Sequence, residues 1–255
     1  VAIISIMKTI KSAKDLENFF NTEFQSLRRQ GKVIKPDSKY FPEIGSTTLE
    51  DIAYENQLKV KSRALQNIFE NYVSEKILDG INVEPSLKIY EYRLKMEFVC
   101  SFNPKFEPHI RFGQRKRGNF NWVIDMDECN LIPRIWFKKI RLIFEFLKDQ
   151  AIIGYDLKRS EGDLRYIVSK INDESSMLIF VVKSYDKSIF DKAANLAINL
   201  GFKSIYLLNN SLKTDIASGE VVEFWGDKYI TIDVNTDKKT YKFKIGPQTF
   251  FQNNI

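Results

Sequence analysis

Basic side chains crowd into one short stretch of this chain, next to several aromatic rings. Cations neutralise phosphates and flat rings stack on unpaired bases, so the combination is typical of binding to single-stranded or looped RNA. A solvated turn between two strands would show the same residues, and the pattern alone slightly favours that simpler interpretation. The cations are Arg111, Arg115, Lys116 and Arg117, the rings are Phe112, Phe120 and Trp122, and further basic groups follow at Lys138, Lys139 and Arg141 and at Lys158, Arg159 and Arg165.

A second pair of cations, Arg93 and Lys95, lies where apolar and charged residues alternate up to Cys100. Alternation with a period of two predicts a half-buried strand, so both cations would project from one face of it. They either pair with Glu91 and Glu97 across the sheet or face a cleft that holds phosphates.

Other reactive side chains have no supporting pattern. Asp125, Asp127 and Glu128 offer oxygen ligands of the kind that Mg²⁺ and Ca²⁺ prefer, but no glycine-containing loop with regular spacing surrounds them. A role at a strand end or helix start is therefore favoured over metal binding.

Cys129 has no neighbouring base that would lower the pKa of its thiol, which favours a buried structural cysteine over a nucleophile. The single histidine, His109, lacks a partner motif.

The composition is that of a soluble globular protein with a moderate basic excess. The formal net charge is +6, which permits binding to nucleic acid without requiring it. Two cysteines are too few for a disulfide scaffold and fit a reducing compartment. No apolar run is long enough to cross a bilayer, and the short apolar start lacks the pattern of a signal peptide. We therefore expect a cytoplasmic protein without a membrane partner.

Hydrophobic periodicity predicts an α+β fold, in which N-terminal helices precede a mostly antiparallel sheet with packed helices. Helices are expected over 12–30 and about 49–78, the second with Thr48 as N-cap and with Glu50 and Asp51 in its first turn. Later helices are expected over 133–149 and 188–200. Strands are expected at 89–100, 111–112, 121–125, 164–170, 178–183, 204–208, 220–224, 229–233 and 241–245.

Five stretches of the chain resemble motifs of a known protein family and follow one another in the same order as in that family. The most specific is Phe243-Lys-Ile-Gly-Pro-Gln-Thr-Phe-Phe-Gln-Asn-Asn254, and the others span 54–61, 90–98, 112–118 with 123–129, and 155–165. Together they resemble the RNA uracil-5-methyltransferase family, which forms 5-methyluridine in transfer or ribosomal RNA. The last stretch is similar to that family's Phe-x-Ile-x-Pro-x-Ser-Phe-Phe-Gln-x-Asn motif.

The resemblance implies a reaction and residue roles. The family transfers a methyl group from S-adenosylmethionine to C5 of a flipped uridine, after a cysteine thiolate has added to C6. By resemblance, Phe250 packs against the flipped uridine, and Gln252 hydrogen-bonds the uridine or the methyl donor. The partner is a tRNA or an rRNA, and no residue of this chain is expected to be catalytic. The residues expected to bind RNA are Arg93, Lys95, Arg115, Lys116 and Arg117.

One departure from the family concerns an iron–sulfur cluster, which many members hold on a Cys-x-x-Phe-x-x-Cys-Gly-x-Cys pattern. Ser38, Ile44 and Thr47 stand where those cysteines would be. Thiolates are the usual ligands of such clusters, so we expect no cluster here.

A second departure concerns the Rossmann-like methyltransferase domain, which follows the Phe-Phe-Gln motif in the family and binds S-adenosylmethionine. Only the residues up to Ile255 are present in this sequence, so we expect that domain to be missing from it. We expect an N-terminal helical segment (1–35), a degenerate iron–sulfur-type loop with a long helix (36–85), a central α+β RNA-recognition domain (86–246) and a stub of the methyltransferase domain (247–255). The leading hypothesis is the RNA-recognition portion of a truncated or split methyltransferase, inactive alone, with a second polypeptide carrying the missing domain. The alternatives are a non-enzymatic RNA-binding module derived from the family and a degenerate product without function.

Overall fold

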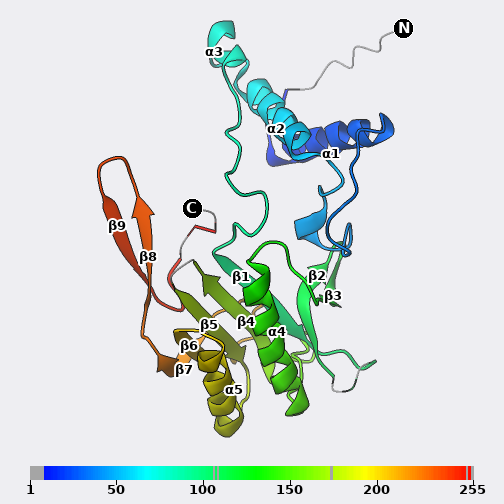
Figure 1. Ribbon diagram of the computed structural model, residues 1–255. Helices are drawn as coiled ribbons and strands as arrows, with labels where there is room; N and C mark the ends of the chain where they lie inside the picture. Colours follow the sequence, from blue (N-terminus) through cyan, green and yellow to red (C-terminus); the bar gives the residue numbers. More distant parts are fainter. Residues whose placement is uncertain (1–8, 106, 108, 173–174, 251, 254–255) are drawn as a thin grey trace. The chain divides into compact units, whose positions relative to one another are not determined.

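The computed structural model describes residues 9–105, 107, 109–172, 175–250 and 252–253 (Figure 1). The chain divides into two compact units. The first comprises residues 1–42 and 46–89, and the second comprises residues 43–45 and 90–255. Within the described ranges, no helix is both long and apolar enough to cross a membrane.

The first unit is built on two helices, α1 (Ala13–Arg29) and α2 (Tyr54–Phe69), followed by the short α3 (Glu75–Asp79). Helix α1 begins where the sequence predicts, because the Ser12 hydroxyl accepts a hydrogen bond from the backbone N–H of Asp15. Its apolar face packs on α2. The buried residues of this small core are Ile10, Phe19, Phe24, Ile52, Val60 and Ala64.

The prediction of one long helix over 49–78 is wrong. Helix α2 begins at Tyr54 and ends at Phe69, and Ala53 occupies its N-cap position in place of Thr48. The acidic residues that suggested a first turn have other partners. The Asp51 carboxylate lies 2.6 Å from Nε of Arg28, and the Glu50 carboxylate accepts a hydrogen bond from the backbone N–H of Ser38.

The second unit is a seven-stranded sheet in the order β3-β2-β1-β4-β5-β6-β7 with a separate hairpin, β8-β9 (Figure 1). All neighbouring strands are antiparallel except β5 and β6, so the predicted α+β class with a mostly antiparallel sheet is confirmed. The strands are β1 (Lys95–Ser101), β2 (Arg111–Lys116), β3 (Asn119–Asp125), β4 (Leu164–Ile171), β5 (Ser176–Val182), β6 (Ser204–Asn209), β7 (Glu220–Gly226), β8 (Ile230–Asn235) and β9 (Thr240–Ile245). A 3-10 turn (Gly45–Thr47) spans one of the places where the chain passes from one unit to the other.

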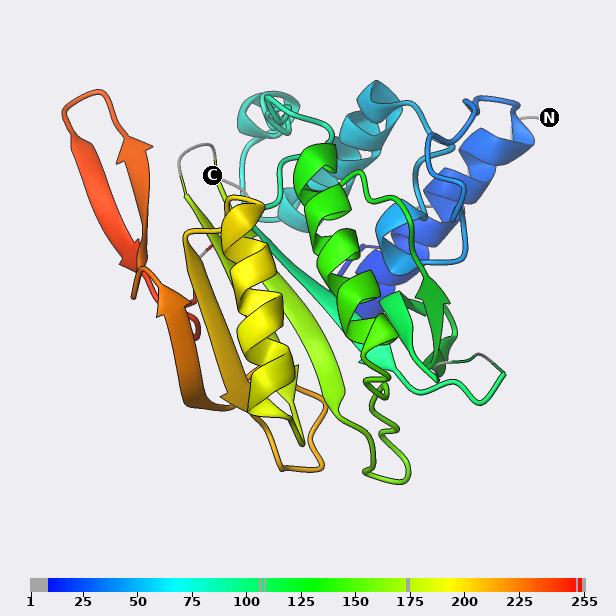
Figure 2. The same cartoon turned by 60° about the horizontal axis from the view of Figure 1, so that its bottom comes forward.

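Two helices, α4 (Arg134–Asp149) and α5 (Lys187–Asn199), lie together on one face of this sheet (Figure 2). On the opposite face, Ile230 and Ile232 of β8 and Ile245 of β9 belong to the same apolar cluster as Tyr166 and Ile179 of the central strands. Because both faces are covered, β4 and β5 are buried along their whole length.

The strand expected from residue 89 begins only at Lys95. Glu91 has a left-handed backbone with φ of 55°, which an extended strand does not allow. The backbone N–H groups of Glu91 and Arg93 bond to the carbonyl oxygens of Asn130 and Leu131 instead of to a neighbouring strand. Arg93 therefore lies before the strand, and it does not share a strand face with Lys95 as expected.

Candidate nucleic-acid interface

The basic stretch forms the end of the β2–β3 hairpin. Gly118 makes the turn with φ of +73°, a conformation that favours glycine. The segment 43–45 runs beside this end of the hairpin. Glu43 accepts a hydrogen bond from the backbone N–H of Arg117 at 2.7 Å, and its carboxylate lies 2.8 Å from Nζ of Lys116. The charge of Lys116 is therefore partly neutralised within the chain.

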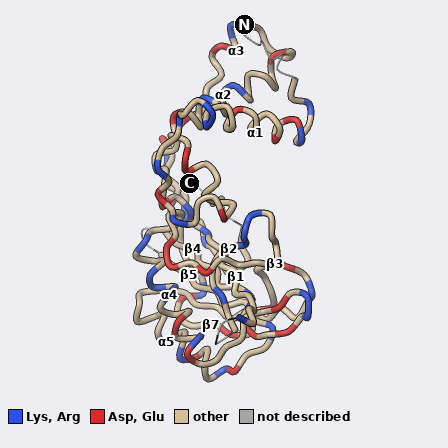
Figure 3. The backbone as a smooth tube through the Cα atoms, turned by 90° about the vertical axis from the view of Figure 1, so that its right-hand side faces the viewer, with Lys and Arg blue, Asp and Glu red and all other residues tan. Residues whose placement is uncertain are grey.

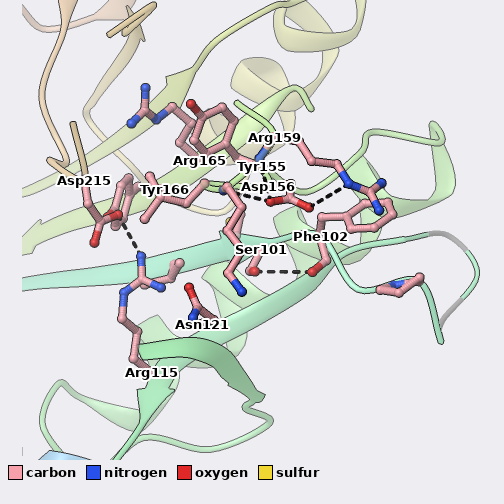
Figure 4. Close-up of a pocket in the computed structure, with 15 residues that line it drawn as sticks. Ser101, Phe102, Arg115, Asn121, Tyr155, Asp156, Arg159, Arg165, Tyr166 and Asp215 are labelled. Atoms are coloured by element: carbon pink, nitrogen blue, oxygen red, sulfur yellow. Dashed lines mark hydrogen bonds and ion pairs between the residues drawn. The ribbon is translucent and has the colours of Figure 1, made fainter. Parts of the chain in front are cut away.

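Arg115 is held from three sides. Its guanidinium lies 2.7 Å from the Asp215 carboxylate (Figure 4). It also donates to the carbonyl oxygen of Phe120 at 2.6 Å and lies 4.0 Å above the Phe120 ring. Asp215 also accepts a hydrogen bond from the Tyr166 hydroxyl at 2.5 Å. Burial, followed by this hydrogen bond to Asp215, raises the pKa of Tyr166 well above its ordinary value. Arg115 thus fixes the hairpin to the loop that carries Asp215.

Arg117 is the most available cation of the group. It is exposed, and within the described part of the chain its guanidinium has no ion-pair partner. The Phe120 ring beside Arg115 is 54% exposed, so one of its faces is open for stacking. Phe112 is not available as the sequence suggested, because its ring is buried against Phe98 and Phe144.

Arg93 and Lys95, the second pair of cations expected to bind RNA, lie in different environments. Lys95 lies on β1 with Nζ 2.6 Å from the Glu97 carboxylate, which is the pairing alternative considered for it. Arg93 is half-buried, and its guanidinium lies 3.6 Å from the Met96 sulfur. Neither side chain is an isolated cation on an open face.

The motif after β9 is held at both ends while its side chains point outward. The ammonium of Lys170 donates to the carbonyl oxygens of Gly246 at 2.7 Å and Thr249 at 2.9 Å. The backbone N–H of Leu94 donates to the carbonyl oxygen of Asn253 at 2.9 Å. Between these ties Phe250 is 83% exposed, and Gln252 is exposed as well. Phe251, the other ring of the motif, lies outside the described residues.

Burial and a nearby cation disfavour the charged form of the Lys170 side chain. Its side chain is buried, and burial lowers its pKa to about 8, with a further lowering by the nearby Lys95 ammonium. Residue 95 lies directly opposite residue 170 in the β1–β4 pairing. The two carbonyl oxygens of the 246–249 turn stabilise the buried ammonium, so the turn and this lysine depend on each other.

The remaining candidate groups do not form reactive centres. Burial raises the pKa of both the Cys100 and the Cys129 thiol, which keeps them protonated at neutral pH. Asp125 is engaged by Arg141, with 3.0 Å between the guanidinium and the carboxylate. Across the ranges that the structure describes, no group of three or more His, Cys, Asp or Glu side chains is arranged to hold a metal ion.

Sequence reasoning missed the groups that organise this surface. Asp215, Tyr166 and Lys170 carry no local motif, and their partners are distant in sequence. Arg165, one of the basic residues noted above, is only 1% exposed, and its guanidinium donates to the carbonyl oxygens of Asn210, Leu212 and Thr214. Basic and acidic residues are interspersed along the backbone (Figure 3).

Comparison with known proteins identifies relatives of this chain, although no family model matches it. An uncharacterised RNA methyltransferase of Caldanaerobacter subterraneus is 29% identical over 84% of this chain and 48% of its own length. A tRNA (uracil(54)-C(5))-methyltransferase of Pyrococcus abyssi is 27% identical over 91% of this chain and 52% of its own length. The chain therefore spans about half the length of the curated relatives it matches.

The fold also matches a solved structure. The crystal structure of the Pyrococcus abyssi tRNA (uracil-54, C5)-methyltransferase in complex with S-adenosyl-L-homocysteine superposes with a TM-score of 0.62 and 28% identity. The match covers 85% of this chain and 48% of that one. The relatives of this chain thus include RNA methyltransferases and tRNA (uracil(54)-C(5))-methyltransferases, the class of enzyme that the sequence resemblance implied.

Proposed function

We propose that this chain recognises the RNA substrate of an S-adenosylmethionine-dependent RNA (uracil-5-)-methyltransferase. The observation that carries the proposal is the match in both sequence and fold to a tRNA (uracil-54, C5)-methyltransferase over 85% of the chain. An RNA partner is also consistent with the exposed Arg117 and the open face of Phe120 beside it.

In this proposal the segment 250–253 meets the target base. Phe250 offers a large exposed ring against which a flipped uridine can pack. Gln252 offers an amide that both donates and accepts, as the edge of a uracil requires. The ties from Lys170 and Leu94 set the position of this segment against the sheet, so that both side chains are presented on a fixed support.

In this proposal, methyl transfer itself is not assigned to the described residues. Addition to C6 needs a thiolate, and both buried thiols have raised pKa values. S-adenosylmethionine would donate the methyl group, but an exposed amide at Gln252 does not by itself enclose such a molecule. We therefore assign this chain the task of binding and presenting RNA, not of activating the base.

RNA binding by the full chain tests the proposal. Fluorescence anisotropy with an unmodified tRNA transcript should show an affinity that falls as salt rises from about 50 mM to about 200 mM, because phosphate contacts release counterions. Single-stranded DNA of matching length is the control for general polyanion binding. Absence of tRNA binding at the lower salt concentration would reject the proposal.

Product analysis tests the link to methylation. Native protein from its source cells, supplied with S-adenosylmethionine and the unmodified transcript, should convert uridine to 5-methyluridine in the digested RNA. Immunodepletion with an antibody against this chain is the control, and it should remove the activity. Activity that survives complete depletion would show that the chain does not serve this reaction.

A further inference from the structure

A polar cavity of about 220 Å³ opens where the end of β1 meets the loop after α4 (Figure 4). Ser101 and Phe102 come from the end of β1, Arg115 and Asn121 come from the β2–β3 hairpin, and the segment 155–159 forms another wall. The basic side chains of the wall outnumber its carboxylates. The cations are Arg115, Lys158, Arg159 and Arg165, and the carboxylates are Asp156 and Asp215.

The walls are fixed by contacts that link distant parts of the second unit. Arg165 is buried over the Tyr155 ring at 4.2 Å and binds three carbonyl oxygens of the 210–214 loop. That loop places Asp215 where it bonds both Arg115 and Tyr166. The opposite wall is ordered by Asp156, whose carboxylate accepts the backbone N–H groups of Lys158 and Arg159 at 2.9 and 3.1 Å. The cavity is therefore preformed.

Several polar groups of the wall are left without protein partners. Asn121 and Lys158 are exposed, and within the part of the chain that the structure describes the Asn121 amide and the Lys158 ammonium make no side-chain hydrogen bond or ion pair, so both are accessible to a ligand. The Tyr155 hydroxyl is buried and likewise lacks a hydrogen-bond partner there. A buried polar group without a protein partner calls for a water, an ion or a ligand to satisfy it. A small number of polar groups that converge on one pocket is a feature of ligand sites. In the view of Figure 4, Asn121 lies between Arg115 and Ser101.

We propose that this cavity binds one unstacked nucleotide of the RNA substrate, separate from the uridine presented to Phe250. The inference rests on the proposed function, because it takes RNA as the partner. The phosphate lies against Lys158 and Arg159, and the Asn121 amide bonds the edge of the base. The half-buried ring of Phe102 provides an apolar wall, with the Arg159 guanidinium 5.7 Å above it.

Charge and size both favour this ligand over others. A net excess of two cations favours an anion such as a phosphate, while the uncommitted amide favours a group with both donors and acceptors. Ligand pockets for larger molecules usually measure about 300–1,000 Å³. At about 220 Å³ the cavity lies below that range, so it can take no more than one nucleotide and excludes a stacked run of bases.

Two substitutions test the cavity directly. Lys158→Ala should weaken binding of a short single-stranded RNA of mixed sequence about fivefold at low salt and lower the salt slope by about one. Asn121→Ala should weaken it about threefold without changing the slope, because it removes a neutral hydrogen-bonding group. Lys238→Ala, at an exposed lysine of the β8–β9 turn, is the matched control and should leave the affinity within about twofold. Photocrosslinking of the same RNA containing 4-thiouridine should label residues 101–102 or 155–159.

The outcomes separate the two hypotheses. If the native chain binds no RNA at low salt, the proposed function fails and this inference fails with it. If the native chain binds RNA but Lys158→Ala, Asn121→Ala and Lys238→Ala all match it, and no crosslink maps to the cavity, the inference alone is overturned. Equal thermal unfolding midpoints for the three variants show that the comparison concerns binding rather than folding.

Discussion

The guanidinium of Arg115 lies 2.7 Å from the carboxylate of Asp215, 100 residues further along the chain. Both side chains are largely shielded from solvent, at 20% and 24% exposure. The pair connects the β2–β3 hairpin at one side of the sheet to the β6–β7 loop. Arg115, which the sequence suggested as an RNA contact, therefore also stabilises the fold, and its substitution should lower the stability of the second unit.

Replacing Asp215 with Asn should destabilise the second unit by about 1–2 kcal/mol, because a charge-assisted pair and the acceptor for Tyr166 are both lost or weakened. Urea unfolding of D215N, R115Q and the double variant gives a coupling energy, expected to be about 1 kcal/mol. Asp227→Asn, at an exposed aspartate of the same unit, is the control. A coupling energy near zero would mean that the ion pair contributes nothing measurable.

Charge reversal at Arg117 should weaken RNA binding without breaking an ion pair of the fold, whereas reversal at Arg115 or Lys116 would do both. Arg115 and Lys116 each have an acidic partner, whereas Arg117 is exposed with no ion pair among the described residues. R117E should therefore weaken RNA binding about tenfold and lower the salt slope by one to two, with the unfolding midpoint unchanged. The measurement is anisotropy across a salt series, with Lys238→Glu as the charge-matched control. Equal effects of R117E and K238E would identify the hairpin as a solvated turn.

Phe250 offers a direct test of the role that the resemblance assigns to it. Because its ring is 83% exposed, Phe250→Ala should change the free energy of unfolding by less than about 0.5 kcal/mol. If the ring packs against the target uridine, the same substitution made in the source cells, in the native protein used for the product analysis, should abolish 5-methyluridine formation, while the variant chain binds tRNA nearly as well as the native chain. Gln252→Ala should likewise lower 5-methyluridine formation more than it lowers tRNA binding. A variant that methylates normally would remove Phe250 from the site.

Thiol chemistry should distinguish structural from reactive cysteines. Burial raises the pKa of Cys100 and Cys129, so neither should react readily with a thiol-specific disulfide reagent in the folded chain at pH 7.5. Both should react within minutes once the chain is unfolded in urea. Rapid labelling of either cysteine in the native protein, followed by mass spectrometry, would contradict their assignment as buried structural residues.

The sequence predicted those elements whose signals are local. Helix α1 follows from its apolar period, and β4 and β5 begin and end within two residues of the strands expected at 164–170 and 178–183. The long helix over 49–78 failed because Asp51, a good first-turn residue, instead binds Arg28 at 2.6 Å. A local propensity was outweighed by a tertiary contact, which no window of sequence reveals.

The candidate site was predictable only in part, for the same reason. The basic hairpin and the Phe250 motif are visible as short patterns. The partners that hold them are not, since Asp215 and Lys170 lie 100 and 76 residues from the groups they bind. An isolated aspartate in a loop and a lysine in an apolar strand have no spacing that indicates such a role. Their function becomes evident only when the sheet brings the segments together.

Lys170 makes the stability of the second unit depend on pH in the direction opposite to that of a lysine whose pKa is raised by an ion pair. In the folded chain burial lowers its pKa from 10.5 to about 8. The unfolded chain keeps the ordinary value and therefore binds more protons than the folded chain between these two pH values. The free energy of unfolding should rise as pH increases from 8 to 10.5, by about 1–3 kcal/mol. The neutral amine still has two N–H donors for Gly246 and Thr249, so the turn is retained.

Lys170→Met isolates this contribution, because every other titrating group is common to both proteins. The variant loses the buried charge and both hydrogen bonds to the 246–249 turn. Urea unfolding at intervals between pH 7.5 and 10 should show the difference in stability between native chain and variant shifting in favour of the native chain as pH rises. Lys238→Met, at an exposed lysine, should show no such trend. A difference that stays constant across this range would mean that Lys170 titrates near its ordinary pKa, and that the turn before Phe250 is not held by a buried, destabilised ammonium.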